Sequence, residues 1–246
     1  KPQDIKKEKL EILNVGRVLN DRVEEFDAVI GRDKEIDLVI ESLLRKKKSN
    51  PLLIGPAGVG KTAIVEELAR RITEKTVPYP LLNKKIIELP MGDLVSGTKY
   101  RGEFEERLTK IIKEVIKNKN IILFIDEVHT MVNAGGAEGA INAGDILKPY
   151  LARGDLRVIG ATTTEEYEKF IAKDKALERR FETIMVSEPT LEETKDILLG
   201  LKSSYEAHHN IKITDENISD IVSLGARYLF RKKNPDKTIV LLDSVC

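Results

Sequence analysis

A glycine-rich loop between an apolar run and a helical segment constrains this chain more than any other feature. The loop reads Gly55-Pro56-Ala57-Gly58-Val59-Gly60-Lys61-Thr62, follows the apolar run 52–54 and precedes a helix predicted over 63–72. Glycine lets such a loop turn its backbone N–H groups inward, and the start of the helix adds a positive potential that favours phosphate. Lys61 can then reach the β- and γ-phosphates, and the Thr62 hydroxyl can bind Mg²⁺. The pattern predicts a strand–loop–helix unit that binds ATP.

A second motif places two carboxylates at the end of a buried strand. The apolar run 121–125 is followed directly by Asp126 and Glu127. Ligands bind at the carboxyl ends of strands in open α/β sheets, so these side chains are expected beside the phosphate loop. Asp126 is expected to hold Mg²⁺ through its water shell, and Glu127 to orient and polarise the attacking water. The two motifs together predict ATP hydrolysis in addition to binding.

Apolar runs that alternate with helical segments predict the fold class. The runs lie at 52–54, 86–89, 121–125, 158–159 and 183–186. Unbroken apolar runs suit strands covered on both faces, and the alternation indicates a parallel, doubly wound, five-stranded sheet with helices on both faces. After residue 188 only helical segments are predicted, at 191–207, 215–231 and 236–244. We therefore expect a linker over 1–22, an α/β nucleotide-binding domain over 23–188 and a small helical lid domain over 189–246.

Composition excludes several other classes of protein. Hydrophobic residues make up 41% of the chain, which is enough for a sizeable core, and the 41 basic residues balance the 41 acidic ones. The balance gives no overall field toward nucleic acid or anionic membranes. Cys246 is the single cysteine, so an internal disulfide is impossible. The three histidines lack zinc-site spacing, and we expect structural roles for them.

The chain is expected to be soluble, because no apolar run approaches the length of about 20 residues that a membrane span needs. It begins at Lys1 instead of Met, which indicates an excised fragment from a longer protein. A targeting signal could have preceded it, so the sequence does not define the compartment.

Several further stretches resemble one family over nearly the whole chain, from about residue 10 to 243. The stretches are Val29 to Asp33, Tyr100 to Arg107, Ala137 to Ala140, Leu147 to Pro149 and Ala176 to Phe181. They are similar to the first ATPase module of the two-module Clp and heat-shock unfoldases, P-loop NTPases of the AAA+ superfamily. The resemblance implies an ATP-driven motor that threads polypeptide through the pore of a homo-hexameric ring, with no nucleic-acid partner and no membrane contact by this segment.

The resemblance also assigns roles around the nucleotide. Asp27, Val29 and Ile30 match the segment that lines the adenine pocket, and Thr163 matches the sensor that reads the γ-phosphate or the attacking water. Arg179 and Arg180 match arginine fingers that reach the nucleotide of a neighbouring subunit. A guanidinium on the transferring phosphoryl group contributes about 10³–10⁵ in rate.

Two loops match segments that face the central pore. Lys99, Tyr100 and Arg101 match the first pore loop, in which an amphipathic tyrosine ring can pack against substrate side chains of arbitrary sequence. Residues Ala137, Glu138 and Gly139 match the second.

The chain departs from the family pattern at a few positions, none of which removes a phosphate or Mg²⁺ ligand. The usual Glu-Pro of the phosphate loop is Pro56-Ala57, and Ala28 stands where Pro is usual. In the lid, Val240 and Ser244 stand where acidic residues are usual. These lid changes affect the expected contacts to nucleotide or neighbour.

Three alternatives remain beside the threading motor. The module could feed a partner protease in a C-type unfoldase, although residues 142–144 favour the B-type disaggregase. It could belong to a nucleic-acid-remodelling AAA+ machine, which the charge balance and Tyr100 disfavour. It could also be a scaffold without hydrolysis, which the intact Lys61, Asp126 and Glu127 argue against.

Overall fold

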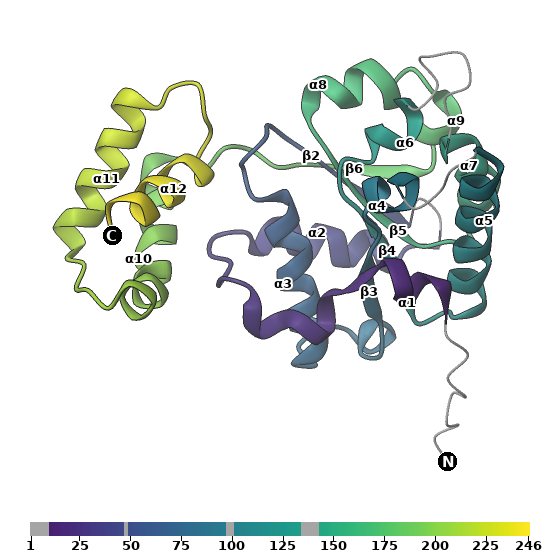
Figure 1. The fold of residues 1–246 in the computed structure, drawn as a ribbon, viewed down its shortest axis with the longest axis horizontal. Coiled ribbons are helices and arrows are strands. Elements are labelled where there is room, and N and C mark those ends of the chain that lie inside the picture. Colours follow the sequence, from purple (N-terminus) through teal and green to yellow (C-terminus); the bar gives the residue numbers. More distant parts are fainter. Residues whose placement is uncertain (1–9, 47–48, 97–100, 134–142) are drawn as a thin grey trace.

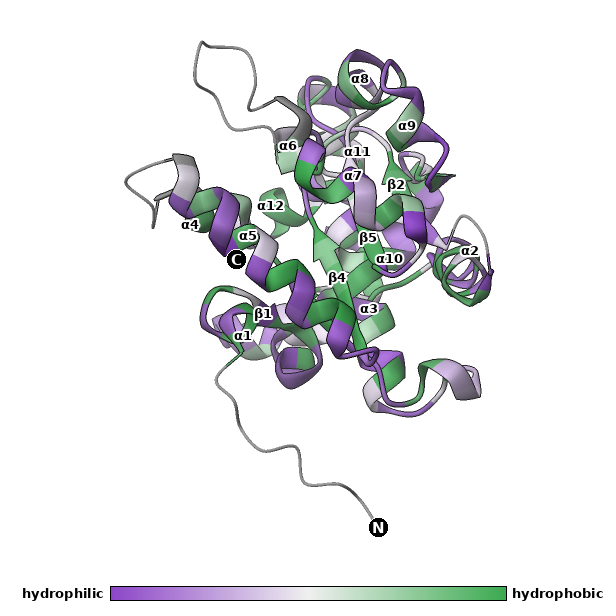
Figure 2. Ribbon diagram, turned by 90° about the vertical axis from the view of Figure 1, so that its right-hand side faces the viewer, coloured by the Kyte–Doolittle hydropathy of each residue, from purple (hydrophilic) through white to green (hydrophobic). Residues whose placement is uncertain are grey.

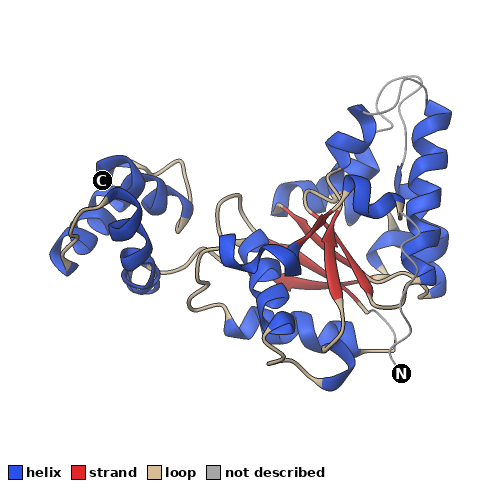
Figure 3. Ribbon diagram, turned by 60° about the horizontal axis from the view of Figure 1, so that its bottom comes forward, coloured by secondary structure: helices blue, strands red, loops and turns tan. Residues whose placement is uncertain are grey.

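The computed structural model describes residues 10–46, 49–96, 101–133 and 143–246 of the chain. They form an α/β domain and, beside it, a smaller domain made only of helices (Figure 1). The sheet lies between layers of helices, and the helical domain follows the last strand through a short connection (Figure 3). This arrangement confirms the predicted fold class.

The sheet has six strands in the order β1-β3-β4-β5-β2-β6. They are β1 Arg17–Val18, β2 Asn50–Ile54, β3 Lys85–Glu88, β4 Ile121–Ile125, β5 Val158–Thr162 and β6 Phe181–Met185. The five predicted strands are present and parallel to one another, with Leu53 of β2 opposite Ala161 of β5 and Ile184 of β6. The sixth, β1, is antiparallel to β3 and was not predicted, because two residues give no apolar run.

The helices of the α/β domain cover both faces of the sheet. The α-helices are α1 Glu11–Val15, α2 Asp33–Leu44, α3 Lys61–Thr73, α4 Met91–Ser96, α5 Arg101–Lys117, α6 His129–Asn133, α7 Ala143–Arg153, α8 Thr164–Glu166 and α9 Lys175–Glu178. Three further turns of helix are η1 Leu19–Glu25, η2 Tyr79–Leu81 and η3 Tyr167–Ile171.

Strand residues alternate between two separate cores, as side chains on a pleated strand must. In β4, Leu123 and Ile125 pack with α1, α5 and α7 on one face, whereas Ile122 and Phe124 pack with α2 and α3 on the other. The strands are therefore apolar on both faces (Figure 2). The unbroken apolar runs in the sequence reflect this double coverage.

The predicted linker over residues 1–22 is wrong from Leu10 onward. Residues 10–22 form α1, β1 and the start of η1, and the side chains of Ile12 and Leu19 are buried in the two cores. Polar residues and Gly16 interrupt the apolar residues of this segment, so it shows neither an unbroken apolar run nor a clear helical stripe. Ile12 is buried because α1 packs against α5, and Leu19 is buried because η1 packs against α3 beside the edge strand β1.

The helical domain consists of α10 Leu191–His209, α11 Asp215–Tyr228 and α12 Asp236–Val245. Thr190 and Thr214 begin the first two helices with capping boxes, which satisfy free N–H groups of the first turn. The three helices enclose their own core, in which Leu198, Ile218 and Leu242 are fully buried. No helix in the described parts of either domain is long and apolar enough to cross a membrane.

Replacing Gly55 with alanine is expected to destabilise the α/β domain. A Cβ at this position would lie 2.1 Å from the Val186 carbonyl oxygen, where β6 leaves the sheet. The backbone must move, and overpacking of this kind costs about 1–3 kcal/mol. Urea unfolding measures the loss of free energy. Gly102→Ala is the matched control: its Cβ meets nothing within 4 Å, and alanine suits helix α5, so no loss is expected there.

Candidate functional site

A cavity of about 1230 Å³ opens at the carboxyl ends of the central strands and is lined by both domains. The α/β domain contributes the segment 27–30, most of the phosphate loop and the ends of β4 and β5. The helical domain contributes Ile197, Leu201, Asp236 and Ile239. A cavity with one charged, glycine-rich wall and one apolar wall suits a ligand with a polyanionic end and an aromatic end.

The phosphate loop has the backbone that its glycines predict. Gly58 and Gly60 have φ values of 80° and 94°, in the region that favours glycine, and Gly60 is the N-cap of α3. The Lys61 ammonium donates hydrogen bonds to the carbonyl oxygens of Gly55 at 2.9 Å and Pro56 at 2.8 Å. Burial lowers the pKa of Lys61, while the charges of Asp126 and Glu127 oppose that shift. The loop thus holds a partly desolvated cation at the start of a helix.

Thr62 and Asp126 meet directly although they come from different elements. The Thr62 hydroxyl donates to Asp126 Oδ2 at 2.7 Å, across the gap between α3 and β4. A hydroxyl and a carboxylate are the hard oxygen ligands that Mg²⁺ prefers, with the remaining positions left to water and phosphate. Among the described residues no group of three or more His, Cys, Asp or Glu forms an all-protein metal site. The pair therefore fits a cation bound together with a nucleotide.

Glu127 has an unusual backbone for a glutamate. Its φ is 49°, and its N–H donates to Asp126 Oδ1 at 2.8 Å. A left-handed conformation of a non-glycine residue costs about 1–3 kcal/mol and occurs often at functional sites. The conformation ends β4 and keeps the Glu127 side chain exposed at the cavity.

The end of β5 supplies hydroxyl groups to the same cavity. Thr163 Oγ1 accepts a hydrogen bond from the Glu166 N–H at 3.2 Å and so caps α8, which leaves its O–H free to donate. The neighbouring Thr162 is buried, and its hydroxyl contacts His129 Nδ1 at 3.0 Å. His129 also lines the cavity, so the turn after β4 is tied to the end of β5.

The structure brings together most of the residues predicted for the nucleotide. Those that line the cavity are Asp27, Val29, Ile30, Ala57, Gly58, Val59, Gly60, Lys61, Thr62, Asp126, Glu127 and Thr163. Gly55 and Pro56 stand behind the loop and bind Lys61 through their carbonyl groups.

Arg179 and Arg180 do not line the cavity. Arg179 and Arg180 are exposed, between α9 and β6. Lys99 and Tyr100 lie outside the described residues, as do Ala137, Glu138 and Gly139. Arg101 is described as the first residue of α5.

Arg32, for which no role was predicted, joins the phosphate loop to the connection between the two domains. Its side chain is largely buried, and Nη2 donates to the carbonyl oxygens of Val59 at 2.8 Å and Ser187 at 2.9 Å. Glu35 accepts from Nη1 at 3.1 Å. Arg32 lies in a stretch that carries the family resemblance, but no local pattern shows that a buried arginine bridges two distant carbonyls.

Contacts from the lid were also missed. The Asp236 N–H donates to the Gly58 carbonyl at 3.2 Å, and Ile30 packs against the lid helix α10 beside Gly200, where a Cβ would overlap Ile30 Cδ1. The lid thus touches both the phosphate loop and the segment on the opposite wall.

Residues 51–189 match the family described as "ATPase family associated with various cellular activities (AAA)", and residues 190–246 match the AAA lid domain. The chain is 58% identical over 219 residues to the chaperone protein ClpB of Oceanobacillus iheyensis, covering 89% of this chain and 27% of that protein. It is equally identical, over 218 residues, to the Clp protease ATP-binding subunit ClpC of Staphylococcus epidermidis, with the same coverage. The chain thus spans about a quarter of these relatives, and identity does not separate the B type from the C type.

Solved structures of a yeast protein share the fold at 42% sequence identity. The S. cerevisiae Hsp104-ADP complex superposes with a TM-score of 0.86 and covers 94% of this chain and 40% of that one. The extended S. cerevisiae Hsp104:casein complex superposes with a TM-score of 0.87, with coverage of 96% and 41%.

Replacing Glu66 with glutamine is expected to change how stability depends on pH. Burial raises the pKa of Glu66 above 4.5, and the carboxylates of Glu88, Asp27 and Asp126 raise it further. A carboxyl with a higher pKa in the folded chain loses stability as pH rises through that pKa. Glu66→Gln should therefore gain thermal stability over the parent at about pH 8 and lose that advantage near about pH 4. Thermal unfolding of the parent chain and the variant at both pH values measures this difference.

Proposed function

We propose that this chain, which belongs to the AAA family of ATPases, is the ATP-hydrolysing module of a ring-shaped motor that unfolds and translocates protein. Family membership supports the ATPase, and the ClpB, ClpC and Hsp104 relatives support protein as the substrate class. Between a B-type disaggregase and a C-type partner of a protease, we favour the B type, on the basis of residues 142–144 alone.

The cavity binds ATP with its phosphates in the loop and its base against the segment 27–30. The triphosphate accepts hydrogen bonds from the loop N–H groups, and Lys61 turns from the carbonyls of Gly55 and Pro56 to the β- and γ-phosphates. Ile30 and the lid residue Ile197 give the base an apolar surface.

The hydrolytic step uses the residues at the ends of β4 and β5. Thr62 and Asp126 would hold Mg²⁺, which neutralises charge on the phosphate oxygens. Glu127 orients a water for attack on the γ-phosphate and accepts its proton. Thr163 donates its free O–H to the γ-phosphate or to that water, since its oxygen already accepts from Glu166.

The observation that supports assembly into a ring of subunits is the position of Arg179 and Arg180. Both arginines are exposed, and neither lines the cavity of its own chain. The transferring phosphoryl group develops charge that a guanidinium can stabilise. We infer that the neighbouring subunit provides this guanidinium, so each site lies between two subunits of a homo-hexamer. The conformational response to hydrolysis is transmitted to Tyr100, which pulls a polypeptide through the ring.

Mixing two inactive variants should restore ATPase activity. Arg179→Ala/Arg180→Ala removes the fingers, and Lys61→Ala removes the phosphate-loop lysine. At random mixing about a quarter of the interfaces pair an intact loop with intact arginines, so turnover should rise above that of either variant alone. Steady-state phosphate release measures it. Mixed rings without any gain would exclude action between subunits.

Tyr100→Ala should abolish unfolding of a fluorescent substrate while leaving ATP turnover of the complete protein largely intact. The proposed role of Tyr100 is to grip the substrate, so its removal should uncouple ATP hydrolysis from substrate movement and leave hydrolysis itself in place. Tyr79→Ala, which removes a tyrosine that is 85% exposed, is the matched control and should unfold substrate normally. Normal unfolding by Tyr100→Ala would contradict threading by this loop.

A further inference from the structure

The segment from Asp27 to Arg32, here called the base wall, lines the cavity but belongs to no helix or strand. It connects η1 to α2, and its last residue, Arg32, donates a hydrogen bond to the Val59 carbonyl of the phosphate loop at 2.8 Å. Without a regular ladder of backbone hydrogen bonds, such a segment keeps one position only if other groups hold it.

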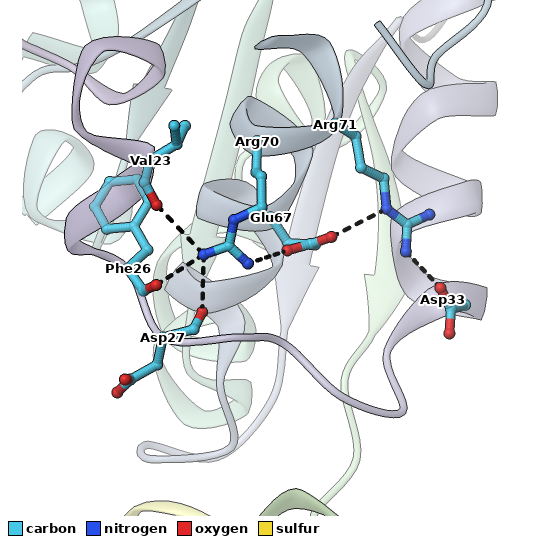
Figure 4. Close-up of polar contacts among 7 residues, drawn as sticks. All are labelled: Val23, Phe26, Asp27, Asp33, Glu67, Arg70 and Arg71. Atoms are coloured by element: carbon cyan, nitrogen blue, oxygen red, sulfur yellow. Dashed lines mark hydrogen bonds and ion pairs between the residues drawn. The ribbon is translucent and has the colours of Figure 1, made fainter. Parts of the chain in front are cut away.

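Arg70 holds the first end of the base wall (Figure 4). Its Nη2 donates to the carbonyl oxygens of Phe26 at 2.7 Å and Asp27 at 3.3 Å, and lies 3.4 Å from that of Val23. The other amino group, Nη1, donates to Glu67 at 2.9 Å. The Arg70 side chain is 20% exposed and that of Glu67 13%, so solvent screens these contacts only in part.

Arg71 holds the second end of the base wall. Its guanidinium pairs with Asp33, the first residue of α2, and lies 3.9 Å from Asp37 one turn later. Its Nε donates to Glu67 at 3.3 Å, so Glu67 accepts from both arginines. Arg70, Glu67 and Arg71 thus form one continuous group, visible in Figure 4, that contacts the chain on both sides of the base wall.

The same helix carries the phosphate loop. Helix α3 runs from Lys61 to Thr73, and its buried face, including Ile64 and Leu68, is packed without exposure against the sheet. A helix packed in this way is rigid over its length. Its first turn therefore fixes the phosphates, and its last turns fix the two ends of the base wall.

We propose that Arg70, with Glu67 and Arg71, is a positioning residue that sets the base wall at the distance from the phosphate loop that a nucleoside requires. This inference rests on the proposed function, because it takes the cavity as the ATP site. Arg70 touches backbone carbonyls and not the ligand, so it controls affinity for the nucleoside part and leaves phosphate binding unchanged. A purely structural arginine would affect both or neither.

The test compares ADP with inorganic tripolyphosphate, each with Mg²⁺, on the parent chain, Arg70→Met and Arg70→Lys. Titration calorimetry gives the Kd values. Arg70→Met keeps the apolar stem but has no hydrogen-bond donor. It should raise the Kd for ADP about tenfold, or about 1.4 kcal/mol, and leave the Kd for tripolyphosphate unchanged. Arg70→Lys keeps a cation that can still reach the Phe26 carbonyl, so its Kd for ADP should lie between those of the parent chain and Arg70→Met. Arg45→Met removes an exposed arginine paired with Glu41 and Glu182 and should change neither Kd.

The positioning role would be overturned if the affinities for ADP and tripolyphosphate fell equally. It would also be overturned if neither Arg70 variant changed the affinity for ADP. If Arg70→Met does not fold, Arg70→Lys alone decides by the same comparison. A parent chain that binds tripolyphosphate but not ADP would contradict nucleoside binding at the base wall and leave phosphate binding by the loop in place. A parent chain that binds neither would overturn the proposed nucleotide site, and with it this inference.

Discussion

The parallel pairing of β2 with β5 and β6 is the interaction on which the site depends. The pairing places the end of β2 between two neighbours, where the Gly55 N–H donates to the Thr162 carbonyl at 3.3 Å and the Val186 N–H to that of Ile54 at 2.7 Å. These bonds continue the sheet beyond the strands. The phosphate loop, the end of β5 and the connection to the lid therefore leave the sheet within one small region, and the cavity forms there.

Polar groups from three elements then set how this region is arranged. Arg32 joins the phosphate loop to the connection after β6, and Glu188 in that connection accepts from the Asn234 N–H at 2.9 Å and pairs with Lys233 at 3.0 Å. Hydrogen bonds therefore hold the lid to the phosphate loop and to the connection after β6. The packing of Ile30 against α10 holds it to the segment 27–32. A change at the phosphates has a direct route to the orientation of the lid.

The sequence predicted the parts of this design that local patterns encode. Glycine spacing located the phosphate loop, and apolar runs located the five parallel strands, because double coverage requires both faces to be apolar. Residues 10–22 were misread because their burial depends on contacts with α5 and α3, far along the chain, and on an edge pairing of only two residues. The roles of Arg32 and Arg70 were missed for a related reason: each bonds to carbonyl groups of residues far away in the chain, and a carbonyl group has no sequence signature.

The hydrogen bonds from Lys61 to the Gly55 and Pro56 carbonyls have a consequence for selectivity. An anion that enters the loop competes with two ligands that the protein itself supplies, so it binds only if its own attraction for the ammonium exceeds theirs. A polyphosphate with several charged oxygens competes for the ammonium more strongly than a single small anion such as chloride, because it offers several charge-assisted hydrogen bonds at once. The two carbonyl groups therefore favour polyphosphates over small anions at this loop.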